Sequence, residues 1–106
     1  MTVTWVPYSS IPTTTALVAI GTATVTATSA IAWSIVATNF ATTNDTPRVD
    51  FARYDGSTSY YVMRNVPIIP GGSVICPNQA MASGYQMRVA VTATTVAVTM
   101  SLANIS

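Results

Sequence analysis

The last twenty residues of the chain alternate large apolar side chains with small or polar ones. The same two-residue period occurs in two runs, at Met87, Val89 and Val91 and then at Val96, Val98, Met100 and Leu102. Such a period is typical of a strand with one buried face. Residues 92–95 separate the runs and are few enough to turn the chain back, so the pattern predicts a terminal hairpin that supplies central strands.

Apolar runs bounded by turn residues predict further strands in the first half of the chain. Residues 16–20 and 22–28 form two such segments, with a break or bulge at Gly21 and a threonine-rich face on the second. Residues 31–40 form the next strand, in which we expect Ile31, Trp33 and Ile35 to point inward. Trp33 is the expected core anchor because a large aromatic ring buries the most apolar area.

The middle of the chain is predicted to form a charged hairpin followed by a second turn. Residues 48–54 and 58–63 flank Asp55-Gly56, a dipeptide that favours a tight turn. Six of the seven formal charges lie between Asp45 and Arg64, which gives this hairpin a water-facing side. Residues 66–77 then read as strand, turn and strand around Pro70-Gly71-Gly72, and Gly84 is placed to turn the chain into the last two runs.

These elements predict an all-β protein, an antiparallel β-sandwich of jelly-roll or immunoglobulin-like type with about seven or eight strands. We expect one sandwich domain over residues 13–106, preceded by an N-terminal arm over residues 1–12. Pro7 and Pro12 interrupt ladder bonding in the arm, while Trp5 and Tyr8 carry more apolar area than a disordered tail exposes. The arm is therefore expected to cover another surface, either that of a neighbouring subunit or that of the shell to which the subunit attaches.

Residues 17–38 are long and apolar enough to span a bilayer as a helix. Their threonines alternate with alanine and valine, and β-branched residues dominate where a membrane helix would favour leucine. The segment is therefore expected to form strands, and no membrane span is predicted.

The charge content favours a subunit of an assembly. Only 7% of the residues are charged, and Lys, Glu and His are absent. A net charge of +1 without a basic cluster excludes nucleic acid and anionic lipid as expected principal partners. Low charge promotes association, so we expect a homo-oligomer, with a trimer as the expected stoichiometry. The candidate interface residues are Trp5, Tyr8, Thr22, Thr24, Thr26, Tyr60, Tyr61 and Arg64.

No group of residues in the sequence suggests catalysis or a bound cofactor. The single cysteine, Cys76, lies in an apolar run with no histidine in the chain to activate it, and it cannot form an intramolecular disulfide. Asp45, Asp50 and Asp55 are spaced five residues apart but lack the closing glutamate and central glycine of a calcium loop. We therefore expect no enzyme activity, no cofactor and no metal site.

A resemblance to a known class of proteins is carried by short strings in the second half of the chain. Four features carry it: the Ile-Pro-Gly-Gly-Ser-Val string within Pro67 to Val74, the glycine that opens the segment Gly84 to Val91, the ending Asn104-Ile105-Ser106, and the earlier strand Ala32 to Asn39, which ends in asparagine. Together they resemble small β-sandwich virion proteins of tailed phages. The resemblance covers residues from about 16 to the C-terminus.

This resemblance implies a structural subunit of the virion and supplies no catalytic residues. The first expectation is a capsid decoration or cement protein that contacts the major capsid protein and stabilises the head shell, after synthesis in the host cytoplasm. A neck or tail adaptor is the alternative within the virion. A different class is a receptor-binding or carbohydrate-binding module, in which Trp5, Tyr8, Tyr60 and Tyr61 form an aromatic platform.

Overall fold

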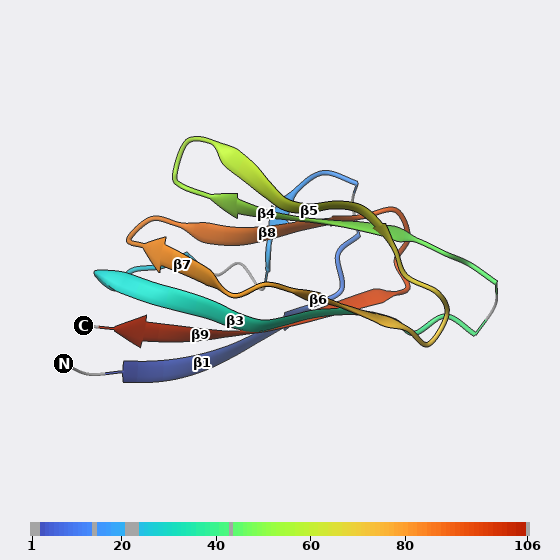
Figure 1. Ribbon diagram of the computed structural model, residues 1–106, viewed down its shortest axis with the longest axis horizontal. Helices are drawn as coiled ribbons and strands as arrows, with labels where there is room; N and C mark the ends of the chain where they lie inside the picture. The colour runs from blue at the N-terminus through green and yellow to red at the C-terminus, as the bar shows by residue number, and fades with distance from the viewer. Residues whose placement is uncertain (1–2, 14, 21–23, 43, 106) are drawn as a thin grey trace.

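Nine β-strands in two antiparallel sheets make up the fold of the computed structural model, which describes residues 3–13, 15–20, 24–42 and 44–105 (Figure 1). The strands are β1 (Val3–Ser10), β2 (Val18–Ala19), β3 (Ser29–Asn39), β4 (Arg48–Tyr54), β5 (Ser59–Pro67), β6 (Ser73–Cys76), β7 (Gln79–Ala82), β8 (Gln86–Val91) and β9 (Val96–Ile105). The predicted antiparallel β-sandwich is confirmed. No helix in the described ranges is long and apolar enough to cross a membrane.

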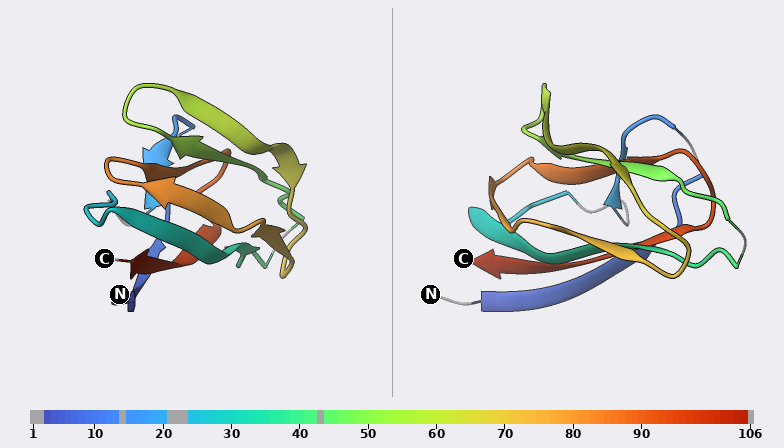
Figure 2. Two further views of the ribbon diagram at one scale, coloured as in Figure 1. Left: turned by 60° about the vertical axis from the view of Figure 1, so that its left-hand side comes forward. Right: turned by 45° about the vertical axis from the view of Figure 1, so that its right-hand side comes forward.

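The strand order is that of a jelly roll. Sheet A has the order β1-β9-β3-β6, with β7 also paired to β3, and sheet B has the order β2-β8-β4-β5. Figure 2 shows the two sheets as separate layers, with β4, β5 and β8 in one and β1, β3 and β9 in the other. Because β6 and β7 pair with successive parts of β3, they act as one interrupted strand. The chain then forms four antiparallel pairs: β1 with β9, β2 with β8, β3 with β6 and β7, and β4 with β5. This is the pairing of an eight-stranded jelly roll, one of the two sandwich types predicted from the sequence.

The predicted terminal hairpin is wrong, although both of its strands are central. β8 lies between β2 and β4 in sheet B, whereas β9 lies between β1 and β3 in sheet A. Residues 92–95 therefore carry the chain from one sheet to the other. Each strand buries its apolar side against the other sheet. Two strands in facing sheets therefore show the same alternation as two strands of one hairpin, and the pattern does not distinguish them.

The expected N-terminal arm outside the sandwich is also wrong for residues 3–10, because they form the edge strand β1. β1 pairs with β9 along its whole length, from Val3 opposite Ile105 to Ser10 opposite Val98 (Figure 1). Pro7 is tolerated because an edge strand has one side without ladder bonds. The sandwich therefore begins before the predicted boundary at residue 12.

Trp33 is not the core anchor, because a bulge in β3 reverses which side chains point inward. The register with β9 shifts between Trp33 and Val36, and Ser34 has a φ of 51°. The inserted residue changes the alternation, so Ile35 is buried as expected while Ile31 and Trp33 point outward. Trp33 is 37% exposed, and Phe51 is the largest fully buried side chain.

The threonine-rich segment contributes less strand than predicted. Thr22 and Gly21 lie outside the described residues, and residues 24–28 form no strand. The chain is instead held at Val25, whose N–H donates to the carbonyl of Tyr85 (2.9 Å) and whose carbonyl accepts from the N–H of Gly84 (2.8 Å). Between Thr24 and Thr28 only Val25 is a large apolar side chain, and it is buried, so this stretch has little apolar surface to hold a full strand in a sheet.

Two predicted turns are confirmed. β4 and β5 form a hairpin, and the Asp55 N–H donates to the carbonyl of Thr58 (3.1 Å) beside Gly56 at φ 100°. At the second turn Gly71 has φ 75° and the Gly72 N–H donates to the carbonyl of Ile69 (2.8 Å). A positive φ suits glycine because it has no Cβ. The second turn leads from sheet B into β6 of sheet A.

A buried amide, that of Asn39, ties the loop after β3 to the loop after β5. Its Nδ2 donates to the carbonyls of Asp45 (3.1 Å) and Ile68 (3.0 Å), and its Oδ1 accepts from the N–H of Ala41 (3.0 Å). Asn39 is fully buried. Both N–H groups of the amide and one of the two lone pairs of its oxygen are used. The side chain therefore joins two loops that have no strand pairing between them at this point.

Candidate functional site

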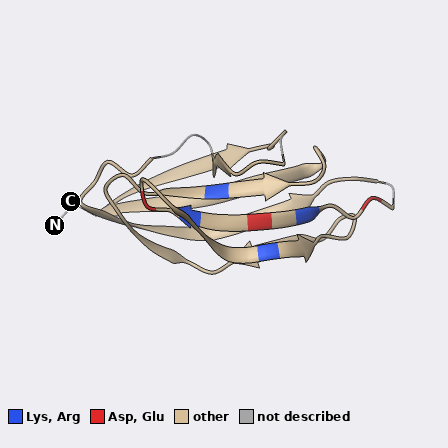
Figure 3. Cartoon of the chain, turned by 90° about the horizontal axis from the view of Figure 1, so that it is seen from above, with Lys and Arg blue, Asp and Glu red and all other residues tan. Residues whose placement is uncertain are grey.

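The two sheets of the sandwich differ in charge. Sheet B holds Arg48, Asp50 and Arg53 on β4, Arg64 on β5 and Arg88 on β8 (Figure 3). The described strands of sheet A contain no charged residue. The two outer faces of the molecule therefore offer different chemistry to a partner.

The outer face of sheet B is covered by its own side chains. The guanidinium carbon of Arg88 lies 3.5 Å from the centroid of the Tyr54 ring, and that of Arg64 lies 4.5 Å from the Tyr61 ring. Ala52 points outward between them, in register with Arg88 and Tyr61, yet it is fully buried. The stacked arginines and tyrosines thus form a polar layer that separates the sheet from water.

The four aromatic residues expected to form a platform do not come together. Trp5 and Tyr8 lie three positions apart on β1, so Trp5 points outward and the half-buried Tyr8 packs against the core. Tyr60 and Tyr61 are on β5 in the other sheet. Tyr60 pairs with Arg53 and Tyr61 with Ala52, so these two neighbours face opposite sides.

The predicted threonine interface is not a strand face. Thr24 is exposed, and its hydroxyl oxygen accepts a hydrogen bond from Nε2 of Gln86 (2.6 Å). Thr26 is exposed as well, and Thr22 lies outside the described part of the chain. Arg64, the remaining candidate, is occupied by its stacking on Tyr61.

Among the described residues, the outer face of sheet A carries only apolar side chains and hydroxyl groups, and we call it the charge-free face. Pairs of residues directly opposite each other in the register lie on the same side of a sheet, which identifies the members of this face. They include Trp5, Pro7 and Ser9 of β1, Thr99, Ser101 and Ala103 of β9, Ile31, Trp33 and Val36 of β3, and Ile75 of β6. Trp5 is 57% exposed and Ile75 71% exposed.

Two tryptophans meet on this face across the middle strand. The ring centroids of Trp5 and Trp33 are 4.8 Å apart and the rings are tilted by 53°. They lie on β1 and β3, which flank β9, and their partners on β9 are the small residues Ala103 and Ser101. The small side chains leave room above β9 for the rings to touch. Sequence reasoning missed this pair because it placed Trp33 in the core.

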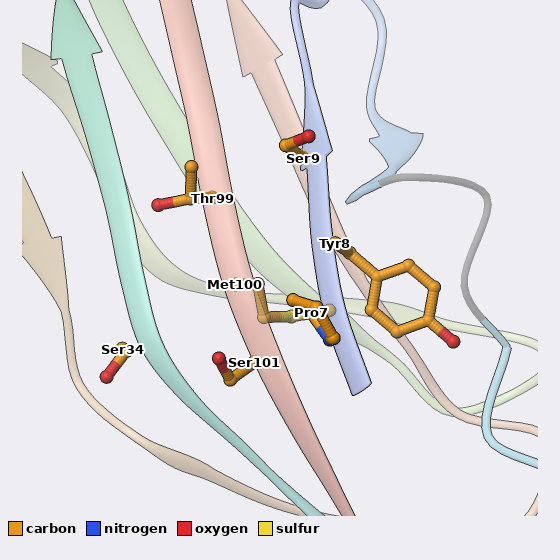
Figure 4. Close-up of a pocket in the computed structure, with 7 residues that line it drawn as sticks. All are labelled: Pro7, Tyr8, Ser9, Ser34, Thr99, Met100 and Ser101. Carbon is orange, nitrogen blue, oxygen red and sulfur yellow. The ribbon is translucent and has the colours of Figure 1, made fainter. Parts of the chain in front are cut away.

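A hollow of about 340 Å³ lies on β1, β3 and β9, the strands that carry and separate the two tryptophans, and Figure 4 draws residues that line it. It is lined by Pro7, Tyr8, Ser9, Ser34, Thr99, Met100 and Ser101. Five of these belong to the charge-free face or to the exposed bulge, and Ser101 pairs with both Pro7 and Trp33. The charge-free face therefore combines a projecting aromatic pair with an adjoining hydroxyl-lined hollow.

Two of the carboxylates bind the chain's own backbone. Hydrogen bonds from the N–H groups of Thr58 (2.8 Å) and Ser57 (2.9 Å) hold the pKa of Asp55 below its usual value. Asp50 Oδ1 accepts from the N–H of Asn65 (2.6 Å). Among the described residues no group of three or more His, Cys, Asp or Glu side chains could hold a metal ion.

The thiol of Cys76 is buried in the core. Burial raises its pKa to about 11. At neutral pH the thiol is therefore protonated and a poor nucleophile.

Comparison with protein-family models, curated proteins and solved structures finds no match for this chain.

Proposed function

We propose that the protein is a structural subunit of a tailed-phage virion, a decoration or cement protein that stabilises the head shell. The observation that carries the proposal is the charge-free face with its exposed Trp5, Trp33 and Ile75. A contiguous exposed apolar surface of this kind is more often a site of protein contact than a surface that stays in water. The centres of protein interfaces are depleted of charge and enriched in aromatic residues, as this face is.

The opposite sheet supports an orientation for such a subunit. Sheet B carries the stacked arginines and tyrosines, which suit contact with water. In the proposed assembly, sheet A lies against neighbouring subunits or the major capsid protein, and sheet B faces solvent. The proposal includes the expected homo-oligomer and requires no nucleic acid, membrane or cofactor.

The jelly-roll order adds support by analogy only. Jelly rolls occur in viral capsid domains and in lectins, and one fold serves many functions. The fold is thus compatible with a virion subunit, and the face chemistry argues for an assembly role.

The proposal is tested on purified particles of the phage that encodes the chain. Mass spectrometry is expected to find the protein in the particle, at a copy number comparable to that of the major capsid protein for a decoration protein. A low copy number would favour the neck or tail adaptor. Absence from the particle would refute a virion role.

A binding assay tests the role of the face directly. Purified protein is added to shells that lack it, and bound protein is measured after sedimentation. Ile75→Arg places a charge on the charge-free face and is expected to reduce binding at least tenfold. Tyr61→Arg, at an exposed position on the outer face of sheet B (46% exposed against 71% for Ile75), is the control and is expected to bind as the wild type does. Equal loss in both variants would refute the proposed orientation.

One observation favours a second candidate, a carbohydrate-binding module. The hollow next to the tryptophan pair is lined by hydroxyl groups, and aromatic rings with hydroxyls suit a neutral sugar. In this case the chain would recognise a glycan through Trp5 and Trp33 in place of the four aromatics expected from the sequence.

A further inference from the structure

We infer that the charge-free face binds a second copy of the chain, face to face about a two-fold axis, with Trp5 of each copy seated in the hollow of the other. The inference rests on the proposed function for the assembly role of this face. Of the two partners proposed for this face, it selects a neighbouring copy of the chain over the major capsid protein, and it adds the geometry of the contact.

A two-fold contact requires that the charge-free face fit a copy of itself. In a two-fold contact the same patch of both copies meets, so a projection must lie near a recess that accepts it. Trp5 is the most exposed aromatic side chain of the face. The hollow begins two residues along the same strand, at Pro7 and Ser9. Its volume of about 340 Å³ lies at the lower end of the range for small-molecule pockets, so it has room for an indole ring.

Charge favours the charge-free face over sheet B as the contact between two copies. Two copies that met through sheet B would bring Arg48, Arg64 and Arg88 of one copy against those of the other, with Asp50 as the only outward carboxylate on those strands. The charge-free face has no such repulsion against itself, and it also offers nothing to pair with a charged partner. The same face of a second copy is also uncharged, so the two faces can meet without leaving a buried charge unpaired.

The charge-free face is also large enough for a stable contact. The strands of sheet A are up to 11 residues long, and four strand positions spaced by about 4.8 Å give a flat face on the order of 600 Å². This is close to the roughly 800 Å² per partner of a standard interface. Trp5, Trp33 and Ile75 lie on it as the large side chains that usually dominate binding.

A face-to-face contact joins copies in pairs, because each copy uses its face once. It therefore gives a dimer and not the trimer expected from the composition. A trimer would need a head-to-tail contact between two different patches.

Sedimentation velocity over a concentration series from about 1 to about 200 µM tests the inference, since contacts of this size reach at least micromolar affinity when well packed. The wild type is expected to be dimeric at the upper end. Trp5→Ala removes the projection and Ser101→Phe fills the hollow, and each is expected to weaken dimerisation by roughly 30-fold or more. Tyr60→Ala, which removes a side chain with similar exposure (54% against 57% for Trp5), is expected to leave dimerisation unchanged. Circular dichroism shows whether each variant is folded.

Mixing the two variants gives a sharper test. The Trp5→Ala copy retains its hollow and the Ser101→Phe copy retains its Trp5, so one of the two symmetric contacts can form in a mixed dimer. The mixture is expected to dimerise more tightly than either variant alone. Because both tryptophans of the chain lie on this face, wild-type tryptophan emission is also expected to shift to shorter wavelength as concentration rises.

The outcomes separate the inference from the proposed function. A wild type that stays monomeric at about 200 µM, a trimer, or equal effects of Trp5→Ala and Tyr60→Ala would overturn the face-to-face contact. A monomer that still binds phage shells would overturn it and leave the virion role standing. A monomer whose tryptophan emission responds to maltohexaose or chitohexaose would assign the hollow to a neutral sugar and overturn both.

Discussion

Replacing Asn39 by alanine tests how the loops at one end of the sandwich are held. The change removes three hydrogen bonds, two donated to the carbonyls of Asp45 and Ile68 and one accepted from the N–H of Ala41. Each bond contributes about 1 kcal/mol net, and a buried partner left without a hydrogen bond costs about 1–3 kcal/mol. Water can reach the Asp45 side, which is only partly buried, but not the Ile68 carbonyl. Asn39→Ala is therefore expected to lower the free energy of unfolding by about 3–5 kcal/mol.

Urea denaturation measures this loss as a change in the free energy of unfolding, and thermal denaturation measures it as a fall in Tm. Both are followed by far-ultraviolet circular dichroism. In a domain of this size about 1 kcal/mol corresponds to about 4–8 °C in Tm, so a fall of at least 12 °C, or about 3 kcal/mol, is expected. Exposed Asn44 provides the matched control, and Asn44→Ala is expected to change the free energy of unfolding by less than about 0.5 kcal/mol. A loss below about 1 kcal/mol in Asn39→Ala would refute the reasoning, since it would mean that the buried amide holds neither loop.

The substitution Asn39→Asp separates hydrogen bonding from shape. The carboxyl group retains the acceptor for the Ala41 N–H but brings an oxygen toward two carbonyl oxygens. Burial and these oxygens raise the pKa of the introduced carboxyl in the folded state above its unfolded value. The ionised form is then the disfavoured one, so the variant should lose stability relative to wild type as pH rises above about 4. A loss independent of pH would contradict this account.

Three further predictions concern the core, a turn and the thiol. Phe51→Ala is expected to lower the free energy of unfolding by about 3–5 kcal/mol, and Trp33→Ala, at a partly exposed position, by about 1 kcal/mol. Urea denaturation at a concentration where the protein is monomeric measures both values. A larger loss for Trp33→Ala than for Phe51→Ala would restore Trp33 as the core anchor. The pKa of Asp55 is lowered in the folded state. The carboxylate therefore stabilises the folded state at a pH above its unfolded pKa, and this stabilisation disappears as the pH falls through its folded pKa. Asp55→Ala should therefore lower Tm at pH 7 and leave it nearly unchanged at pH 2, and an equal effect at both would refute the role of the carboxylate. Cys76, with a pKa of about 11, should react with a thiol reagent at pH 8 only at the rate of unfolding, and fast labelling of the folded protein would contradict its burial.

The sequence alone determined the fold class and the local turns. Strand periodicity depends on neighbouring residues, so it predicted an all-β chain, and Asp55-Gly56 predicted the β4–β5 hairpin because a tight turn is encoded by adjacent residues. The clustering of charge between Asp45 and Arg64 already indicated that one part of the chain faces water. The edge position of the first strand was also within reach, because a strand that contains proline is confined to a sheet edge.

The tertiary structure decided which strands are neighbours and which side of each faces out. A two-residue period shows that one face is buried but not in which sheet, so β8 and β9 could be assigned to separate sheets only from contacts distant in sequence. The bulge at Ser34 reversed the expected direction of Trp33, since one inserted residue changes every position on one side of it. The tryptophan pair and the charge-free face follow from the register of β1, β9 and β3, in which residues up to about a hundred positions apart lie side by side. Hydrogen bonding and packing across that distance select one register among many, and local sequence carries no record of that choice.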